Sequence, residues 1–213
     1  MLKTIWKEKK RIFLNTLWIF LALGLIFQSV NYFLQTETDQ KQRDVIQTEE
    51  RALINAGEKA LSLRVNRLIA DVFFIRDSLL LLGPESRDDA DVRQLWLSFS
   101  NRKMIYHQIR YLDSDGNEVI RVNYEGGQAC VVPDEELQNK KDRYYFADTI
   151  ILGENQIYIS KLDLNIENGA IQQPATPELR LSTPVFSEDN RLLGIVVLNY
   201  YAEEMLEQLR EAN

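Results

Sequence analysis

An unbroken apolar stretch at residues 12–33 limits what this chain can fold into more than any other feature. It reads IFLNTLWIFLALGLIFQSVNYF and contains no Asp, Glu, Lys, Arg or Pro. A helix of this length, rising about 1.5 Å per residue, extends about 33 Å and can cross a hydrocarbon core of about 30 Å. A buried core helix would be shorter and would show a polar face, whereas the polar residues here lie near the two ends. The sequence therefore predicts a transmembrane helix over residues 12–34.

A cleaved signal peptide is the main alternative, because it too has a basic start followed by an apolar run. Such a peptide ends at a cleavage site with small residues two positions apart. The triplet Ala22-Leu23-Gly24 has this spacing, but it lies in the middle of the run and is followed by more apolar residues. We therefore expect the stretch to be retained as a membrane anchor.

The charges on either side of the stretch predict its orientation. Residues 1–11 contain five Lys or Arg side chains and one Glu, whereas the first charges after the stretch are Glu37 and Asp39. Basic flanks remain on the cytoplasmic side of a membrane. We expect residues 1–11 to form a cytoplasmic tail and the chain from residue 35 onward to lie on the other side.

Charge and composition exclude several classes of function. The 25 basic and 32 acidic residues give a net charge of -7, and residues 1–11 hold five of the basic ones, so the rest of the chain is more acidic still. An acidic surface repels phosphate backbones, so we expect no nucleic-acid partner. One Cys and one His cannot form an internal disulfide or a Cys/His zinc site. A Ser-His-Asp triad would have to use His107, and we expect neither catalysis nor a cofactor.

Residues 35–83 are predicted to form one long helix that ends at Gly83-Pro84. Apolar residues recur there in steps of four and three, which indicates a helix that buries one stripe. The stripe packs either in a coiled-coil-like dimer or against its own domain. We expect a homodimer through this helix. The stripe comprises Ile54, Leu61, Val65, Leu68, Val72, Ile75, Leu79 and Leu82, and the expected dimer seam comprises Leu61, Leu68, Val72 and Ile75.

Residues 84–213 have the composition of one mixed domain. A short helix is expected at residues 88–99 and an exit helix at 202–210, and a second short helix leads into an aromatic segment within 133–148. Between them, alternating and apolar runs predict strands, of which 192–200 is the most apolar and is expected to be central. The predicted strands are 106–112, 118–124, 129–132, 157–166, 179–186 and 192–200. The fold class is therefore α+β: one transmembrane helix and a long helix packed on a roughly five-stranded antiparallel sheet.

The segment DSDGN at residues 113–117 invites two readings. Its two aspartates suggest a calcium loop, but Gly116 is at the fourth position rather than the sixth, and Tyr124 replaces the glutamate expected at the twelfth. A hairpin turn between two strands fits the spacing better.

The order of these elements resembles the Cache or PDC family, the PAS-like extracytoplasmic sensor domains of bacterial histidine kinases, diguanylate cyclases and chemoreceptors. The resemblance covers residues 35–213. It rests on DSDGNE at 113–118, DRYYF at 142–146, IYISKLDL at 157–164, LRLSTPVF at 179–186 and GIVVLN at 194–199. It implies a cytoplasmic tail (1–11), a transmembrane helix (12–34), a long periplasmic helix (35–83) and a PAS-like sensor domain (84–213).

This resemblance implies the periplasmic signal-sensing region of an inner-membrane receptor. The kinase or cyclase output of such a receptor would belong to the parent protein, and we expect this chain to be truncated before it. The implied partner is a small-molecule ligand. The alternative is a membrane-anchored interaction module that docks a partner such as a periplasmic binding protein.

An Arg-x-aromatic-aromatic-x-Asp run lines the pocket in amine- and amino-acid-binding members of this family. The matching positions here are Arg143, Tyr145, Phe146 and Asp148. Arginine can bind a ligand carboxylate, Asp can accept from an ammonium group, and aromatic rings can flank a cation. The chain departs from the run at Phe146, where the family has a tyrosine, and an upstream tyrosine is replaced by Gln138.

Neighbouring strands add polar residues that face the same cleft if their strands pair as expected. Tyr158 and Ser160 share one strand face, and Arg180 and Ser182 share another. Such a cleft would suit an anionic small molecule. Arg143 has a structural alternative as a salt-bridge partner, and the aromatic residues have one in the core. The expected ligand-binding residues are Arg143, Tyr145, Asp148, Tyr158, Ser160 and Arg180.

Overall fold

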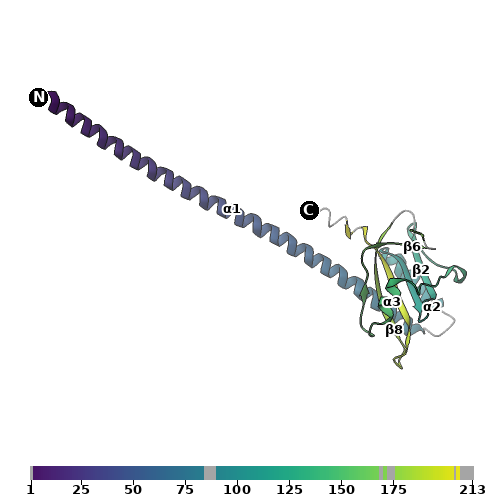
Figure 1. Ribbon diagram of the computed structural model, residues 1–213. Coiled ribbons are helices and arrows are strands. Elements are labelled where there is room, and N and C mark those ends of the chain that lie inside the picture. The colour runs from purple at the N-terminus through teal and green to yellow at the C-terminus, as the bar shows by residue number, and fades with distance from the viewer. Residues whose placement is uncertain (1, 84–89, 168–169, 172–175, 204, 207–213) are drawn as a thin grey trace. The chain divides into compact units, whose positions relative to one another are not determined.

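The structure is a computed structural model that describes residues 2–83, 90–167, 170–171, 176–203 and 205–206 (Figure 1). The chain divides into two compact units, Met1–Ala60 and Leu61–Asn213. Helix α1 (Leu2–Leu82) supplies all of the described part of the first unit and the beginning of the second.

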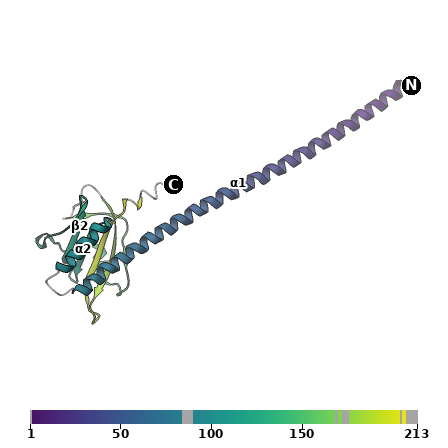
Figure 2. The ribbon, with the colours of Figure 1, turned by 180° about the vertical axis from the view of Figure 1, so that it is seen from behind.

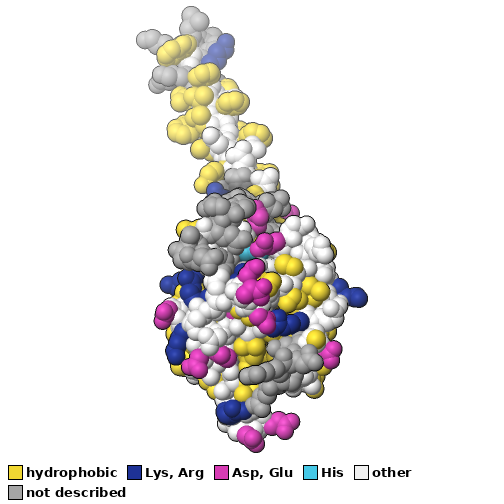
Figure 3. Space-filling view, turned by 90° about the vertical axis from the view of Figure 1, so that its right-hand side faces the viewer, with side chains coloured by type: hydrophobic (Ala, Val, Ile, Leu, Met, Phe, Trp, Pro, Cys, Tyr) yellow, Lys and Arg dark blue, Asp and Glu magenta, His cyan; other side chains and the backbone are white. Residues whose placement is uncertain are grey.

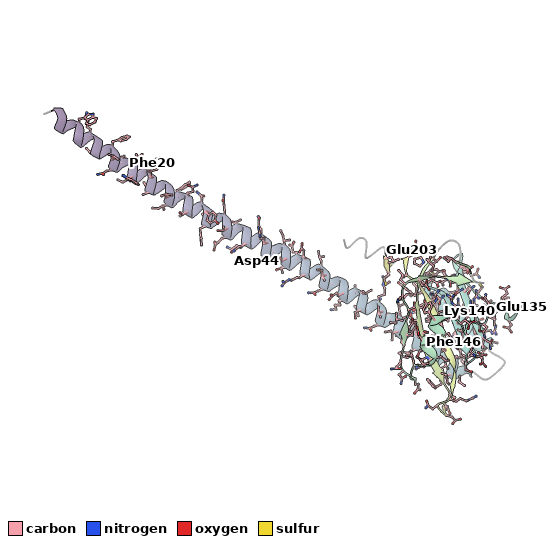
Figure 4. The ribbon with its side chains drawn as sticks, in the orientation of Figure 1. Phe20, Asp44, Glu135, Lys140, Phe146 and Glu203 are labelled. Carbon is pink, nitrogen blue, oxygen red and sulfur yellow. The ribbon has the colours of Figure 1, made fainter. Side chains whose placement is uncertain are left out.

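The first unit is a helix whose large apolar side chains are exposed. Trp18, Phe20 and Phe27 are each about two-thirds exposed or more (67%, 73% and 71%), and hydrophobic side chains cover this part of the helix in Figure 3. Figure 4 shows Phe20 pointing away from the helix axis. Thr16 donates to the carbonyl of Ile12, so its hydroxyl is satisfied within the helix. In the described part of the chain, this one helix is long and apolar enough to cross a membrane.

The second unit begins with the last turns of α1, whose apolar stripe is buried in the unit's own core. Leu68, Val72, Ile75 and Leu79 are at most 2% exposed and belong to one cluster with side chains of the sheet. The dimer seam expected at Leu61, Leu68, Val72 and Ile75 is therefore wrong at three of its four positions. The seven-residue repeat arose from packing against the helix's own sheet, which the sequence had left as the alternative.

Helix α2 (Ala90–Lys103) completes the layer that α1 begins. Trp96 is fully buried, and its indole Nε1 donates to the hydroxyl of Ser78 on α1 at 3.0 Å. Figure 2 shows α2 and the end of α1 on the same side of the sheet. The helix predicted at residues 88–99 is confirmed, although residues 84–89, which include Pro84, lie outside the described residues.

In the part of the chain that the structure describes, the sheet has seven antiparallel strands, in the order β3-β2-β1-β9-β8-β4, with β5 also paired to β8. Strand β9 lies between β1 and β8, so the prediction that the most apolar strand is central is confirmed. The α+β class with a long helix on an antiparallel sheet is also confirmed. The long strands are β1 (Tyr106–Asp113), β2 (Glu118–Glu125), β8 (Pro177–Phe186) and β9 (Leu192–Tyr201), and the shorter ones are β3 (Gln128–Val131), β4 (Tyr158–Ile159) and β5 (Asp163–Leu164).

The segment at residues 113–117 is a hairpin turn. The Asp113 carboxylate accepts from the backbone N–H groups of Asp115 and Asn117, both at 2.9 Å. Gly116 has a φ of +82°, and a Cβ there would lie 2.7 Å from the backbone of Lys141, so only glycine fits.

Two elements differ from their prediction. The strand expected at residues 157–166 is divided into β4, β5 and β6 (Ile166–Glu167), because the pairing with β8 shifts by one residue between Ile159 opposite Leu181 and Asp163 opposite Glu178. The aromatic segment is itself the helix α3 (Tyr144–Ile150), and only a 3-10 turn, η1 (Asp134–Glu136), precedes it.

Three smaller features lie at the limits of the described residues. Strand β6 pairs with β7 (Ala170–Ile171), while the turn expected at Asn168-Gly169 lies outside the described residues. Within the predicted exit helix, Glu203, Met205 and Leu206 are helical, and residues 207–210 are also outside the described part.

The two faces of the sheet are covered differently. Helices α1 and α2 pack on one face over the larger apolar cluster, and α3 packs on the other over a small one (Figures 1 and 2). Residues of the small cluster are Leu112, Tyr145, Phe146, Ile195 and Val197. The rest of this second face is polar, and it holds the candidate site.

Candidate ligand-binding site

Helix α3 turns its aromatic residues toward the sheet. Tyr145, Phe146 and Thr149 are buried on one side of the helix, whereas Tyr144 is exposed on the other. Phe146, labelled in Figure 4, packs on Leu112 and its neighbours and belongs to the core, as the structural alternative had it. The packing of α3 on the sheet therefore fixes the position of Tyr145.

Tyr145 lies between two buried arginines. Its hydroxyl accepts from Arg110 Nη1 at 3.1 Å, and the Arg180 guanidinium carbon lies 5.5 Å from the centre of its ring. Arg110 and Arg180 are only 2% and 1% exposed. We call the group formed by Arg110, Tyr145 and Arg180 the two-arginine site. Arg143 contributes a third guanidinium, 5.9 Å from the same ring centre.

Arg180 has many partners, but each contact is long. Nη1 donates to the Tyr144 hydroxyl at 3.2 Å and to Asp163 at 3.3 Å, and Nη2 donates to Asn165 at 3.4 Å and to Glu178 at 3.3 Å. Charge-assisted hydrogen bonds are usually about 2.7–2.9 Å long. Within the described residues, Nε has no partner at all. The guanidinium is thus held in place, but its hydrogen-bonding capacity is not fully used.

Arg110 lies in a denser group on β1 and β2. Its Nε lies 3.3 Å from Glu118 Oε1, and the other Glu118 oxygen accepts from the backbone N–H of Gln138 at 3.0 Å. In the sheet register Arg110 is opposite Arg121 on one side and Val197 on the other. Lys140, labelled in Figure 4, is also buried here and donates to the Gln138 side chain at 2.8 Å.

The remaining sequence-predicted residues lie around this group, with different roles. Ser160 Oγ accepts from the backbone N–H of Arg180 at 2.9 Å and donates to the Lys161 carbonyl, so it holds the strands together. Tyr158 is opposite Ser182 in the sheet, and desolvation, together with a hydrogen bond to Asp148, raises its pKa to about 12. The phenol therefore remains protonated at neutral pH.

The structure brings the six predicted residues into one region, formed by α3 and the strands beneath it. The structural alternative for Arg143, a salt bridge, is not found within the described residues, where its guanidinium lies over the Tyr145 ring. Sequence reasoning missed Arg110, Tyr144, Asp163 and Glu178. Arg110 could have been noticed from the strand pattern, because it is a charged residue between two apolar ones. Its neighbours Ile109 and Tyr111 point to the larger apolar cluster on the other face of the sheet.

A separate cleft of about 590 Å³ lies at the end of α1 beside the β8–β9 turn. It is lined by apolar residues such as Leu80 and Phe186 and by the acidic side chains of Glu154, Glu188 and Asp189. It is open to solvent and contains none of the buried polar atoms that lack partners. The two-arginine site is therefore the better candidate, because burial and incomplete hydrogen bonding coincide there.

Comparison with known proteins gives the family and the fold. A family model described as "Bacterial histidine kinase, sensor domain" matches residues 26–210. Comparison with curated protein sequences finds no significant match.

Solved structures with the same fold come from several bacterial receptors. The extracellular domain of a protein described as a histidine kinase, vpHK1S-Z8, is 24% identical with a TM-score of 0.62, covering 76% of this chain and 60% of that one. A domain of a sensory box/GGDEF family protein from Vibrio parahaemolyticus is 25% identical with a TM-score of 0.54, covering 74% and 64%. The ligand-binding domain of the Campylobacter jejuni chemoreceptor Tlp3, in complex with 4-methylisoleucine, is 8% identical with a TM-score of 0.60, covering 75% and 60%. This chain thus spans less than two thirds of the length of each.

Proposed function

The chain belongs to the bacterial histidine kinase sensor-domain family, and on that premise we propose that its two-arginine site binds the carboxylate of a small organic acid. Sensor domains of this family are the extracellular ligand-binding parts of bacterial receptors. The observation that carries the proposal is Arg180, a guanidinium almost without solvent exposure whose Nε has no partner among the described residues. A planar donor of this kind matches a carboxylate, and burial strengthens the contact.

An amino-acid-like ligand fits the surroundings of Arg180. Its carboxylate would lie on Arg180, its side chain against the Tyr145 ring, and its ammonium group near Asp148 or Asp163. The complex of Tlp3 with 4-methylisoleucine supports this ligand class, although its 8% identity extends only to the fold. Phe146 packs in the small core cluster, so it offers the ligand no hydroxyl at the position where the family has a tyrosine.

The position of the sensor relative to the membrane is part of the proposal. The basic tail at residues 1–11 remains in the cytoplasm, residues 12–34 cross the inner membrane, the long helix of residues 35–83 follows, and the sensor domain of residues 84–213 lies in the periplasm. The helix that is long and apolar enough to cross a membrane supports this arrangement. Likeness to histidine kinase and GGDEF proteins supports a kinase or diguanylate cyclase output in the parent receptor.

We retain the homodimer, but on the opposite side of α1 from the seam first expected. Leu63, Phe74 and Leu81 are 49%, 47% and 85% exposed, and they fall with Ala70 in steps of seven, four and seven along the helix. Two anchored copies have parallel helices and a raised effective concentration, which favours pairing along such a stripe. Ligand binding would then change how the two helices pack, with a coupling of about 1 to 3 kcal/mol.

A second candidate is the interaction module that docks a periplasmic binding protein. The observation in its favour is that Arg110, Tyr145 and Arg180 already fill the site with side chains and are each at most 2% exposed. In that case small acids would not bind, and a purified binding protein would.

The test is a thermal-shift screen of the full chain in lipid nanodiscs against L-isoleucine, γ-aminobutyrate, succinate and acetate. A ligand at 100 times its Kd should stabilise the folded state by about 2.7 kcal/mol. The stabilisation should disappear in Arg180→Lys, which keeps the charge but loses the planar fork, and should persist in Arg102→Lys, an exposed arginine on α2. Equal stabilisation in both variants would contradict the proposal.

A further inference from the structure

His107, the only histidine of the chain, is buried between two carboxylates. Nδ1 contacts Glu178 Oε1 on β8, and Nε2 lies 3.3 Å from Glu125 Oε1 on β2. A neutral imidazole has one N–H and one lone pair, so it can donate to only one of these acceptors. Both contacts are satisfied together when the ring carries a proton on each nitrogen.

Glu178 joins this histidine to the two-arginine site. Its Oε1 faces His107, while its Oε2 accepts from Asn199 at 2.8 Å and from Arg180 Nη2 at 3.3 Å. The side chain is fully buried, so water does not screen these contacts. One carboxylate is thus shared between the imidazole and the guanidinium expected to hold the ligand.

Within the described residues, Tyr201 also packs on His107, and it does not change charge near neutral pH. The Tyr201 ring on β9 lies 5.2 Å from the imidazole centre, and its hydroxyl donates to the Tyr124 carbonyl at 2.7 Å. Burial, with a further effect of the charges on Glu125 and Glu178, raises the pKa of Tyr201 to about 12. The Tyr201 phenol therefore keeps its proton across neutral pH.

We propose that His107 is a positioning residue which, through Glu178, makes the carboxylate affinity of Arg180 dependent on pH. This inference rests on the proposed function for the identity of the site. When His107 is protonated, it neutralises Glu178 and leaves Arg180 available to a ligand carboxylate. When it loses the proton, Glu178 keeps an uncompensated charge, pairs more strongly with Arg180 and competes with the ligand. Affinity for an anionic ligand therefore falls as pH rises.

The first test needs no ligand. The full chain, without a histidine tag, is placed in lipid nanodiscs with ¹⁵N-labelled histidine and arginine, and NMR follows the imidazole and the Arg180 Nε–H resonance from pH 5 to 8. Because the chain has one histidine, the imidazole titration is assigned without mutation, and Arg180→Lys identifies the arginine resonance. We expect the Arg180 resonance to follow the imidazole curve. Glu178→Gln, which keeps the shape and removes the charge, should abolish this dependence, and an Arg180 resonance that stays constant while His107 titrates would overturn the proposal.

The second test uses L-isoleucine and γ-aminobutyrate as probes in calorimetry at pH 5.5 and pH 8. The bound probe should lose about tenfold in affinity at the higher pH, within the usual range for coupled sites. His107→Gln should reduce the change to less than about twofold, since histidine is the side chain that ordinarily titrates in this range. A tenfold change that persists in His107→Gln contradicts the coupling. If neither probe binds at any pH while the Arg180 resonance still follows His107, the coupling is supported and the proposed ligand class is what fails.

Discussion

The two faces of the sheet differ in what they contribute to the protein. The face under α1 and α2 is an apolar cluster around Trp96, Ile109 and Leu198, each fully buried. The side chains on the face under α3 are almost as deeply buried, but many of them are polar or charged. They include Gln108, Arg110, Glu178, Arg180 and Asn199 on the same strands. Burying a charge costs free energy unless the charge is paired, so the charged face contributes less to the stability of the sheet than an apolar face would. The comparison teaches that the apolar face stabilises the fold, while the polar face carries buried charges that the proposed ligand site would use.

The largest effect should come from the helix-covered face. Replacing Trp96 by Ala removes a fully buried ring and its hydrogen bond to Ser78, and should lower the free energy of unfolding by about 3–5 kcal/mol. Urea denaturation measures the loss. Ile151→Ala, at a side chain that is 81% exposed and lies outside the proposed dimer stripe, should change stability by less than about 0.5 kcal/mol.

The second effect separates folding from binding on the α3 face. Arg180→Met leaves Glu178 buried with one cation fewer, and should cost about 3 kcal/mol of folding free energy. The double variant Arg180→Met with Glu178→Met removes both charges and should recover most of that loss, because apolar replacements of a buried pair are often neutral. A double variant as unstable as the single one would show that this face holds the fold after all.

A smaller effect is expected from Tyr145→Phe. The change removes only the hydroxyl that accepts from Arg110 at 3.1 Å and should cost about 1–2 kcal/mol of stability. Ligand affinity should fall by only a few-fold, because the variant keeps the ring that faces Arg180. Isothermal titration of the variant beside wild type gives the ratio of affinities, and unchanged affinity would show that the ligand does not depend on this hydroxyl.

The smallest effect concerns pH. The pKa of Tyr158 is raised to about 12 from an ordinary value of 10.0, mainly by desolvation and then by Asp148. A raised pKa contributes stability that is complete below the unfolded-state value and is lost as pH rises toward the folded-state value. Melting temperatures should therefore fall more steeply between pH 10 and about 12 in wild type than in Tyr158→Phe. Parallel curves would mean that the phenol is not held by Asp148.

The sequence was sufficient for the features that depend on local pattern. Length and charge predicted the apolar helix, alternation predicted β1, β2, β8 and β9, and the DSDGN spacing predicted the turn that Asp113 caps. A resemblance in the order of elements led to the region in which Arg143, Tyr145 and Arg180 meet.

The rest depended on contacts that pattern does not contain. A seven-residue repeat is the same whether Val72 and Ile75 face another copy or their own sheet, so the seam was expected at residues that are buried in the unit's own core. Arg110 and Glu178 belong to the site only because β1, β9 and β8 pair in one register. The division of the 157–166 strand depends on a one-residue shift in the pairing with β8 between Ile159 and Asp163. Such pairings join residues far apart in the chain.

The most direct measurement of the central claim is the ratio of ligand affinities between wild type, Arg180→Lys and Arg102→Lys, determined by calorimetry on the full chain in nanodiscs. If Arg180 is the carboxylate receptor on the α3 face, the first variant should bind the best acid of the screen at least about tenfold more weakly than wild type, and the second should match wild type within about twofold. Equal affinity in all three proteins would contradict the assignment of this face to ligand binding.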